Sequence, residues 1–484
     1  MKKNVMALLL SASLLGGCMG CAGKEAKTGG QQDDIPELVW YVPGKPQNDI
    51  DKVMEKANEF LVPEIGAKLK LTFIEDSAYQ EKMKMYMASK SQFDLCFVGY
   101  LLSSNSCARN GATLPLRDLI KENCPDLLNS MPEYAWKAAE YNGDYYCVPN
   151  YQINAMTDCL AVRKDMAEKY NLDTSSVTKT EDIVPFLEKI RDNEPTLIPI
   201  SMVAKVWDEP LWGGAYEYFG TETMYFNQNT KKLYPVYEVP ELKEAWKKGH
   251  EFYEKGFIQK DIASAQDISS KQASGQYVVS TTVYKPGVET TLKDSLGGYD
   301  YTCMQISKPT IARNSPTATA IAVSKQSKHP DKAVKLISLL NTNKEFYNLI
   351  CFGIEGVHYT KTGENRIELK ENSSYKPLNA WKFGNQLNAY ILPGQDDNVW
   401  EETDKMNKEA MVSPLLGFAE DNTSVATEIA QMEKISQEYI VSRLNKGAEN
   451  PDEYWDEFVS KMKEAGIEKV VAEYQRQIDE FLSK

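Results

Sequence analysis

The residues that most often carry out catalysis are sparse in this 484-residue sequence. His250 lies in a lysine-rich segment and His329 precedes Pro330, and neither has the spacing to another histidine or cysteine that a zinc site needs. His358 is the remaining histidine, and no His-based catalytic triad is recognisable. The sequence also lacks the glycine-rich motifs that cradle phosphates. We therefore expect no catalytic residue, no metal and no cofactor.

Cysteine is the other reactive residue type, and the number and spacing of the cysteines do not indicate a particular function. The cysteines beyond the first 35 residues are odd in number, so they cannot all pair, and they show no C-x-x-C spacing. A buried thiol behaves as a small apolar group. We expect free thiols for most of these cysteines, and one or two disulfides remain possible. The cysteines concerned are Cys96, Cys107, Cys124, Cys147, Cys159, Cys303 and Cys351.

Composition narrows the classes of partner. An apolar content of 42% supports a real core, and about 450 residues suffice for two or three domains or one large two-lobed body. The formal net charge is −14 and no basic cluster is present. An acidic surface argues against nucleic acid or an anionic membrane face as the main partner.

The N-terminus carries an export signal. Lys2 and Lys3 precede an apolar run, residues 5–15, that is too short to span a bilayer. The run ends in Leu-Gly-Gly-Cys18, which resembles the lipobox of bacterial lipoproteins, and that resemblance implies a diacylglycerol on Cys18 and cleavage before it. We therefore assign residues 1–17 to a lipoprotein signal peptide and residues 18–35, which are rich in Gly, Lys, Gln and Asp, to a flexible tether.

The body begins with a regular alternation of elements. Apolar runs predict strands at 37–42, 69–73 and 93–99, and helical periodicity predicts helices at 50–61 and 79–89. This order predicts a parallel sheet covered by helices, with ligands at the carboxyl ends of its strands. Further along, Asn142-Gly143 predicts a tight turn, and residues 304–323 have strand character. Helices are expected at 180–192, 240–255, 330–340, 344–352, 425–444, 451–465 and 467–482.

Ordered landmarks in the body resemble the extracellular solute-binding proteins of ABC importers, specifically the sugar-binding group. Residues 141–149 are similar to the family's "YNGKIYGVP" segment, and residues 160–166 to its "LYYNKDLL" segment. Residues 321–324 match its return strand, and residues 328–333 match its "KHPEKA" helix start. Two further segments resemble a subgroup of long lipoproteins with a C-terminal domain of unknown function: residues 347–359 and 413–418.

The resemblance implies an α/β, two-lobed fold of the periplasmic-binding-protein-like type II, each lobe a mixed sheet flanked by helices, with a helical C-terminal extension. It places lobe 1 at residues 36–149 plus 300–355 and lobe 2 at 150–299 plus 356–484. It further implies hinge closure around a solute, delivery to ABC permease subunits, no enzymatic activity and a monomer. The anchor would hold the protein on the outer face of the plasma membrane, as in a Gram-positive cell.

Sugars have apolar C–H faces and hydroxyl edges, so a sugar site needs aromatic platforms and a few polar groups. Aromatic and acidic residues at the ends of the expected strands meet this need, and so do aromatic residues in later loops. Glu355 lies in a Gly-Ile-Glu-Gly loop whose glycines let a ligand approach the backbone. The candidate ligand-binding residues are Trp40, Tyr41, Asn48, Asp76, Tyr100, Trp207, Trp212, Tyr284, Arg313, Glu355 and Trp381.

The predicted function is therefore capture of a mono- or oligosaccharide by a lipid-anchored component of an ABC importer. Three alternatives stay open. Aromatic residues also hold peptide side chains or other polar solutes. A surface glycoside hydrolase would have a similar anchor, and its two carboxylates come from distant segments that leave no spacing signal. A scaffold or adhesion lipoprotein would bind no solute.

Overall fold

The computed structural model describes residues 35–201, 215–220, 222–377 and 379–483. The chain divides into two units at the bond between Ile35 and Pro36, and the structure below is that of the second unit, Pro36–Lys484. Trp207 and Trp212, two of the predicted ligand residues, lie outside the described residues. Within those residues, no helix combines the length and apolar character needed to cross a membrane.

The first sheet confirms the predicted alternation of strands and helices. Strands β1 (Glu37–Pro43), β2 (Lys68–Ile74) and β3 (Leu95–Gly99) run parallel, connected by α1 (Ile50–Ile65) and α2 (Asp76–Ala88). The chain returns much later to add β15 (Thr319–Val323) antiparallel to β3, and β6 (Val148–Pro149) pairs antiparallel with β15. The sheet order is β2-β1-β3-β15-β6. β6 consequently runs in the same direction as β1, β2 and β3.

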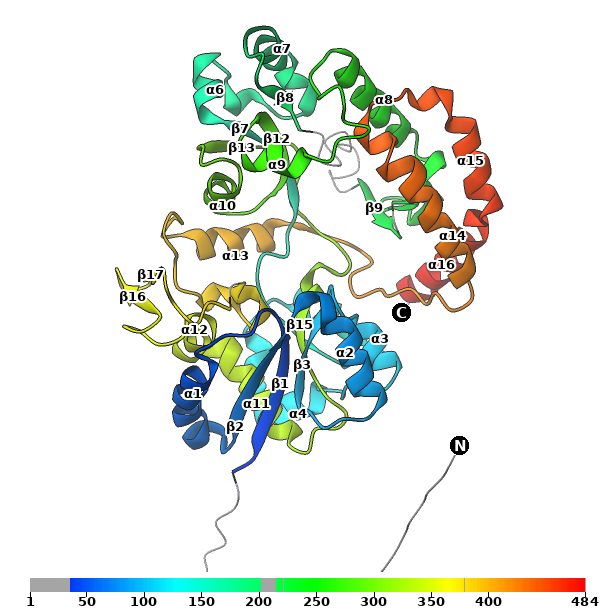
Figure 1. Cartoon of the computed structure of the whole chain (residues 1–484). Coiled ribbons are helices and arrows are strands. Elements are labelled where there is room, and N and C mark those ends of the chain that lie inside the picture. Colours follow the sequence, from blue (N-terminus) through cyan, green and yellow to red (C-terminus); the bar gives the residue numbers. More distant parts are fainter. Residues whose placement is uncertain (1–34, 202–214, 221, 378, 484) are drawn as a thin grey trace, which may run out of the picture. The chain divides into compact units, whose positions relative to one another are not determined.

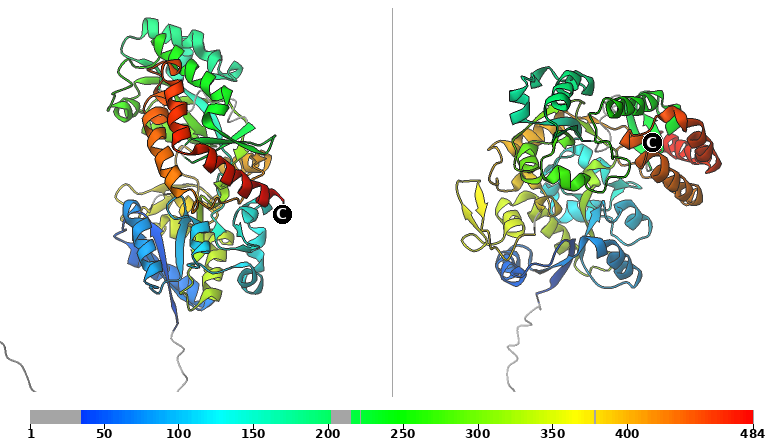
Figure 2. Two further views of the ribbon diagram at one scale, coloured as in Figure 1. Left: turned by 90° about the vertical axis from the view of Figure 1, so that its right-hand side faces the viewer. Right: turned by 45° about the horizontal axis from the view of Figure 1, so that its top comes forward.

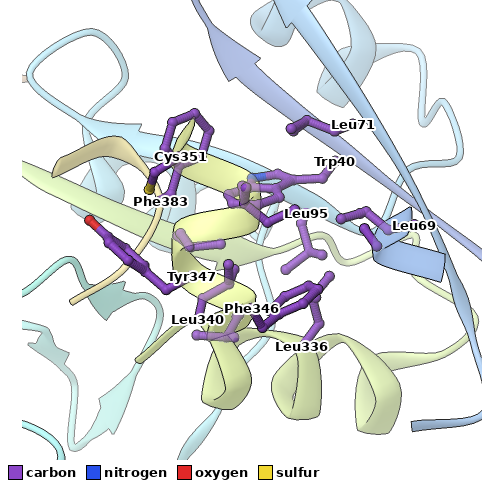
Figure 3. Close-up of a cluster of buried hydrophobic side chains, with 14 of the residues drawn as sticks. Trp40, Leu69, Leu71, Leu95, Leu336, Leu340, Phe346, Tyr347, Cys351 and Phe383 are labelled. Carbon is purple, nitrogen blue, oxygen red and sulfur yellow. The ribbon is translucent and has the colours of Figure 1, made fainter. Parts of the chain in front are cut away.

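Alternation along β1 divides its side chains between two cores. Leu38, Trp40 and Val42 are fully buried on one face, against α1, α11 (Pro330–Thr342) and α12 (Lys344–Phe352). Figure 3 shows Trp40 among Leu69, Leu71 and Leu95 of this core, beside Phe383. Residues on the other face of the sheet pack against α2. Because both faces of this sheet are buried, it holds in place the residues that follow the carboxyl ends of its strands.

A tight hairpin precedes the first crossover, as the Asn-Gly pair predicts. Asn142 (φ 49°) and Gly143 (φ 81°) connect β4 (Glu140–Tyr141) to β5 (Asp144–Tyr145). Two successive positive φ angles are those of a type I′ turn, which this residue pair favours.

Three short helices lie between β3 and this hairpin in the sequence: α3 (Ser104–Arg109), α4 (Arg117–Asn123) and α5 (Glu133–Ala138).

The second sheet has the order β13-β7-β12-β8. β7 (Thr157–Arg163) pairs antiparallel with β12 (Tyr277–Tyr284) and with β13 (Tyr301–Gln305), and β12 pairs in parallel with β8 (Ile198–Ile200). Its helices are α6 (Lys164–Lys169), α7 (Val184–Asn193), α9 (Ile268–Ala273) and α10 (Val288–Ser295). The expected lobe boundary at residue 300 is wrong, because the backbone of residues 301–305 pairs with β7 and the first sheet receives the chain only at β15.

The C-terminal helices share a core with a third, three-stranded sheet. This sheet has the order β11-β10-β9 and consists of β9 (Tyr216–Phe219), β10 (Met224–Asn227) and β11 (Lys232–Pro235). α8 (Pro240–Glu254), α14 (Ala426–Ile435), α15 (Trp455–Glu464) and α16 (Ile467–Leu482) bury their apolar faces against it. Figures 1 and 2 show α14, α15 and α16, in orange and red, beside the green helix α8.

The segment after α12 is divided between regions, which corrects the expected assignment of residues 356–484 to lobe 2. The hairpin of β16 (Tyr359–Lys361) and β17 (Ile367–Leu369), with Tyr375 and Phe383, packs into the core of the first sheet. Large apolar side chains between residues 359 and 390 bury their surface in the core of the first sheet and not in that of the second. α13 (Val399–Glu409) then leads to β18 (Met411–Val412), which pairs in parallel with β14 (Thr310–Ile311).

Candidate functional site

The carboxyl edge of the first sheet gathers the side chains that are best placed to meet a ligand. Since β1, β2, β3 and β6 run in the same direction, the residues that follow them lie along one edge. Asp76 follows β2 as the first residue of α2, and Tyr100 follows β3. Trp381 reaches the same edge from a 3-10 turn, Ala380–Lys382, and its ring centroid lies 6.0 Å from that of Tyr100.

Tyr100 is held at this edge by the backbone around it. Its amide donates to the carbonyl oxygen of Ala318 (2.9 Å), just before β15. Gly99 (φ 134°) allows this approach, because a Cβ there would lie 2.0 Å from the same oxygen. The Tyr100 side chain is nevertheless 55% exposed, an unusual exposure for a large aromatic ring. Partial burial, and then the charge of Asp76, raises the pKa of Tyr100. The ring is therefore accessible at this edge of the sheet.

A buried lysine fixes the acidic part of the site. The Lys382 side chain is only 2% exposed, and its Nζ donates to the carbonyl oxygen of Pro43 (2.9 Å) and to Oδ1 of Asp76 (3.3 Å). Asp76 keeps 56% of its side chain exposed. Within the described part of the chain its other carboxylate oxygen accepts no hydrogen bond, so it can accept one from a ligand hydroxyl. Sequence reasoning missed Lys382, and its only local signal is its place beside Trp381.

The expectation for Trp40 is wrong. β1 extends to Pro43, three residues beyond Trp40, so the indole lies inside the sheet rather than at its end. The Trp40 side chain is fully buried and meets Phe383 edge to face at 5.9 Å. Tyr41 points to the opposite face, where it packs on Tyr86 (5.2 Å), and its pKa is raised by burial and then by Tyr86. The structure therefore does not bring Tyr41 into the group at the carboxyl edge.

Asn48 and Glu355 belong to a different surface. Asn48 is exposed in the turn before α1, next to Asp49, whose Oδ2 lies 3.3 Å from Nε2 of the buried His358. Glu355 lies on the loop that His358 stabilises and pairs with Lys361 (3.4 Å). It lines an open pocket of about 550 Å³. A surface ion pair with Lys361 is a simpler explanation of Glu355 than contact with a ligand.

Arg313 is committed to a structural network. Its guanidinium lies 3.3 Å from Glu217 and 3.5 Å from Glu420, and it covers the ring of Phe219 at 3.8 Å. Glu217 also accepts the Arg313 amide proton (2.9 Å) and the Ser413 hydroxyl proton (2.5 Å). With 11% of its side chain exposed, Arg313 connects β9 to the C-terminal region instead of reaching a ligand as expected.

Tyr284 ends β12 and lines a second pocket, of about 400 Å³, at the edge of the second sheet. Burial, and then Glu289, raises the pKa of Tyr284. No group of three or more histidine, cysteine or acidic side chains suited to a metal ion occurs in residues 35–483 as far as they are described.

Comparison with known proteins identifies the chain. Residues 51–345 match the family described as bacterial extracellular solute-binding protein, and residues 414–483 match a domain of unknown function, DUF3502. The chain belongs to the extracellular solute-binding proteins. The sequence-based expectation of this family, with the C-terminal domain of its long subgroup, is thereby confirmed. The mixed α/β fold with a helical C-terminal region is confirmed as well.

Two relatives and one solved structure are similar to this solute-binding protein over much of its length. A carbohydrate ABC transporter substrate-binding protein of Streptococcus pneumoniae is 30% identical over 99% of this chain and 97% of its own length. Lipoprotein LipO of Bacillus subtilis is 23% identical over 54% of this chain and 52% of its own. The crystal structure of the N-glycan transport solute binding protein NgtS of S. pneumoniae matches with a TM-score of 0.82 and 27% identity, over 93% of this chain and 99% of NgtS.

These relatives bear on the remaining expectations. The S. pneumoniae relative and NgtS are substrate-binding components of transporters by their descriptions, which agrees with the expected absence of enzymatic activity. The family is extracellular by description, so this solute-binding protein works outside the cytoplasm. NgtS has also been crystallised in complex with Man1GlcNAc and with Man5GlcNAc, and those structures match with TM-scores of 0.70 and 0.66.

Proposed function

We propose that this protein captures an oligosaccharide containing mannose and N-acetylglucosamine and delivers it to the permease of an ABC importer. The observation that carries the proposal is the convergence of Tyr100, Trp381 and the free oxygen of Asp76 at one sheet edge. An aromatic pair of which Tyr100 is exposed and Trp381 is partly buried offers a platform for sugar C–H faces, and a carboxylate accepts from hydroxyls. The ligands of NgtS, a relative at 27% identity, supply the choice of sugar.

We further propose that the solute is held between two lobes, each containing one of the two larger sheets. Closure of the lobes around the solute would create the surface that the permease recognises, so binding and delivery would be coupled. In this view lobe 1 contains residues 36–149, the return strand β15 and the segment up to about residue 390. Lobe 2 contains the second and third sheets with the C-terminal helices. The protein would act as a monomer.

Calorimetric titration tests the proposed ligand. We expect saturable binding of an unchanged mannose–N-acetylglucosamine oligosaccharide, and no binding of short peptides. Removing one aromatic platform forfeits about 1.5–3 kcal/mol of apolar contact, so Tyr100→Ala or Trp381→Ala should weaken binding by about 10- to 100-fold. Met85→Ala, which truncates a 56% exposed apolar side chain on α2, is the control and should bind as the parent does.

The outcomes separate the alternatives. Binding of peptides in place of sugars would move the protein to another solute class, and release of a shorter sugar would make it a glycoside hydrolase. Binding of no solute at all would favour a scaffold. Equal affinity of the parent and both aromatic variants would remove the carboxyl edge of the first sheet from the site.

We propose that Cys18 carries the membrane anchor and keeps the protein at the outer face of the plasma membrane, as in a Gram-positive cell. The support is the signal-like N-terminus that ends in Leu-Gly-Gly-Cys18, and the partial match to a lipoprotein. A single acyl chain binds a membrane only marginally, whereas two give stable attachment. Labelling with radioactive palmitate should mark the parent but not Cys18→Ser, which should be released into the medium. Cys21, the other cysteine in the first 35 residues, provides the control, and Cys21→Ser should be labelled as the parent is. Palmitate on Cys18→Ser would refute this assignment.

A further inference from the structure

The pocket at the edge of the second sheet has a defined construction. It lies where β12 ends, between that strand, helix α10 and the connection formed by residues 153–156. Figure 1 shows α10 close to β7, β12 and β13. The volume of about 400 Å³ falls within the 300–1,000 Å³ range of small-molecule sites. The pocket is therefore large enough for part of one sugar unit with its substituent.

One wall of the pocket is apolar. Val288 and Leu292 lie one turn apart on α10 and are 3% and 7% exposed, and Ala155 closes the wall from the crossover. The same helix face carries Thr291 and Ser295 into the lining. The Ser295 hydroxyl donates to the carbonyl oxygen of Thr291 (2.7 Å), so towards the pocket it acts as an acceptor. A wall of this kind favours a small apolar group beside a polar one.

Among the described residues that line the pocket, one is cationic, Lys285. Lys285 follows Tyr284 at the end of β12, and no carboxylate among the described residues forms an ion pair with it. Crowding by its neighbours lowers the pKa of Lys285, and no nearby charge opposes this effect. By contrast, Lys293 on helix α10, which follows Lys285 in the sequence, is paired with Asp300 at 2.9 Å. Lys285 thus offers N–H donors to whatever enters the pocket.

We propose that this pocket binds the acetamido group of an N-acetylated hexosamine unit of the ligand, a specificity that rests on the proposed oligosaccharide function. The methyl group would contact Val288 and Leu292, and the carbonyl oxygen would accept from Lys285. A plain hexose would leave both the apolar wall and the lysine without a partner. A uronate would pair with Lys285 but would desolvate its charge against Val288 and Leu292, which is costly.

Two disaccharides that differ only in this group test the proposal. The full-length chain is titrated with mannosyl-β1,4-N-acetylglucosamine and with mannosyl-β1,4-glucose. We expect the acetylated sugar to bind at least about tenfold more tightly, since one well-placed hydrogen bond and a buried methyl group differ between them. Lys285→Met should remove most of this preference by weakening only the acetylated sugar. Lys285→Gln keeps an N–H donor and should retain part of it.

Two controls make the result specific. Lys293→Met removes a charge from α10 without touching the pocket and should keep the full preference. Tyr100→Ala should weaken both disaccharides by the same factor. Equal binding of the two sugars by the parent, or an unchanged preference in Lys285→Met, would overturn the inference and leave the oligosaccharide function standing. If the parent binds neither disaccharide nor any longer mannose–N-acetylglucosamine oligosaccharide, the proposed function fails, and this inference fails with it.

Discussion

Replacing Asn407 by alanine should destabilise the protein through its crossover segment. Asn407 lies on α13, is 1% exposed, and uses its whole amide on residues 152–155. Its Oδ1 accepts from the amides of Asn154 (2.8 Å) and Ala155 (3.0 Å), and its Nδ2 donates to the carbonyl oxygen of Gln152 (2.7 Å). One side chain here replaces the partners that a neighbouring strand would supply.

The magnitude follows from the backbone groups left unpaired. Asn407→Ala orphans two amide donors and one carbonyl oxygen, and each unsatisfied buried group costs about 1–3 kcal/mol. Water can enter the space vacated by the amide, so we take the lower end and expect a loss of about 3 kcal/mol in the free energy of unfolding. For a body spanning residues 36–484, with an unfolding entropy of roughly 1 kcal/mol/K, this lowers Tm by about 3 °C.

Urea unfolding followed by tryptophan fluorescence measures the loss, with thermal melting as a second readout. Lys405→Ala is the matched control, because Lys405 is exposed on the same helix and its truncation should change stability by less than about 0.5 kcal/mol. A loss below about 1 kcal/mol in Asn407→Ala would refute the reasoning, since it would mean that the crossover finds other partners at little cost.

Three further predictions use other features of the fold. Lys382→Met should weaken sugar binding, because Asp76 would then be free to move. Calorimetry should show the loss of affinity, and circular dichroism should show an unchanged fold. An unchanged affinity would contradict the positioning role of Lys382. Burial raises the pKa of Cys124 to about 11 and that of Cys147 to about 12, so iodoacetamide should label both slowly in the native protein and rapidly in urea. An unfolded thiol ionises near pH 9.0, so the unfolded state loses its proton first, and urea unfolding should show stability falling as pH rises from about 9 to about 11. Gly417→Ala should lower Tm by a few degrees, because a Cβ there would lie 2.8 Å from a backbone oxygen of α5 and Gly417 has φ 81°; an unchanged Tm would show that the two segments can separate.

Local sequence patterns were sufficient for the elements. Strand alternation and helical periodicity predicted β1, α1, β2, α2 and β3, because burial on a face repeats every two or every 3.6 residues. Asn142-Gly143 predicted its turn, because both residues tolerate positive φ. The late helices followed from the same periodicity. Each of these signals comes from residues that are neighbours in the chain.

The site depended on contacts between distant segments. The sequence by itself supplied Asp76, Tyr100 and Trp381 as candidates, and it could not indicate that the buried ammonium of Lys382 joins the first of them to the end of β1. Nor could it show that β1 continues past Trp40 and buries the indole. Strand pairing and the packing of one apolar face against another decide such matters, and neither leaves a periodic trace in the sequence. Tertiary structure alone therefore determined which candidates meet at the edge of the sheet.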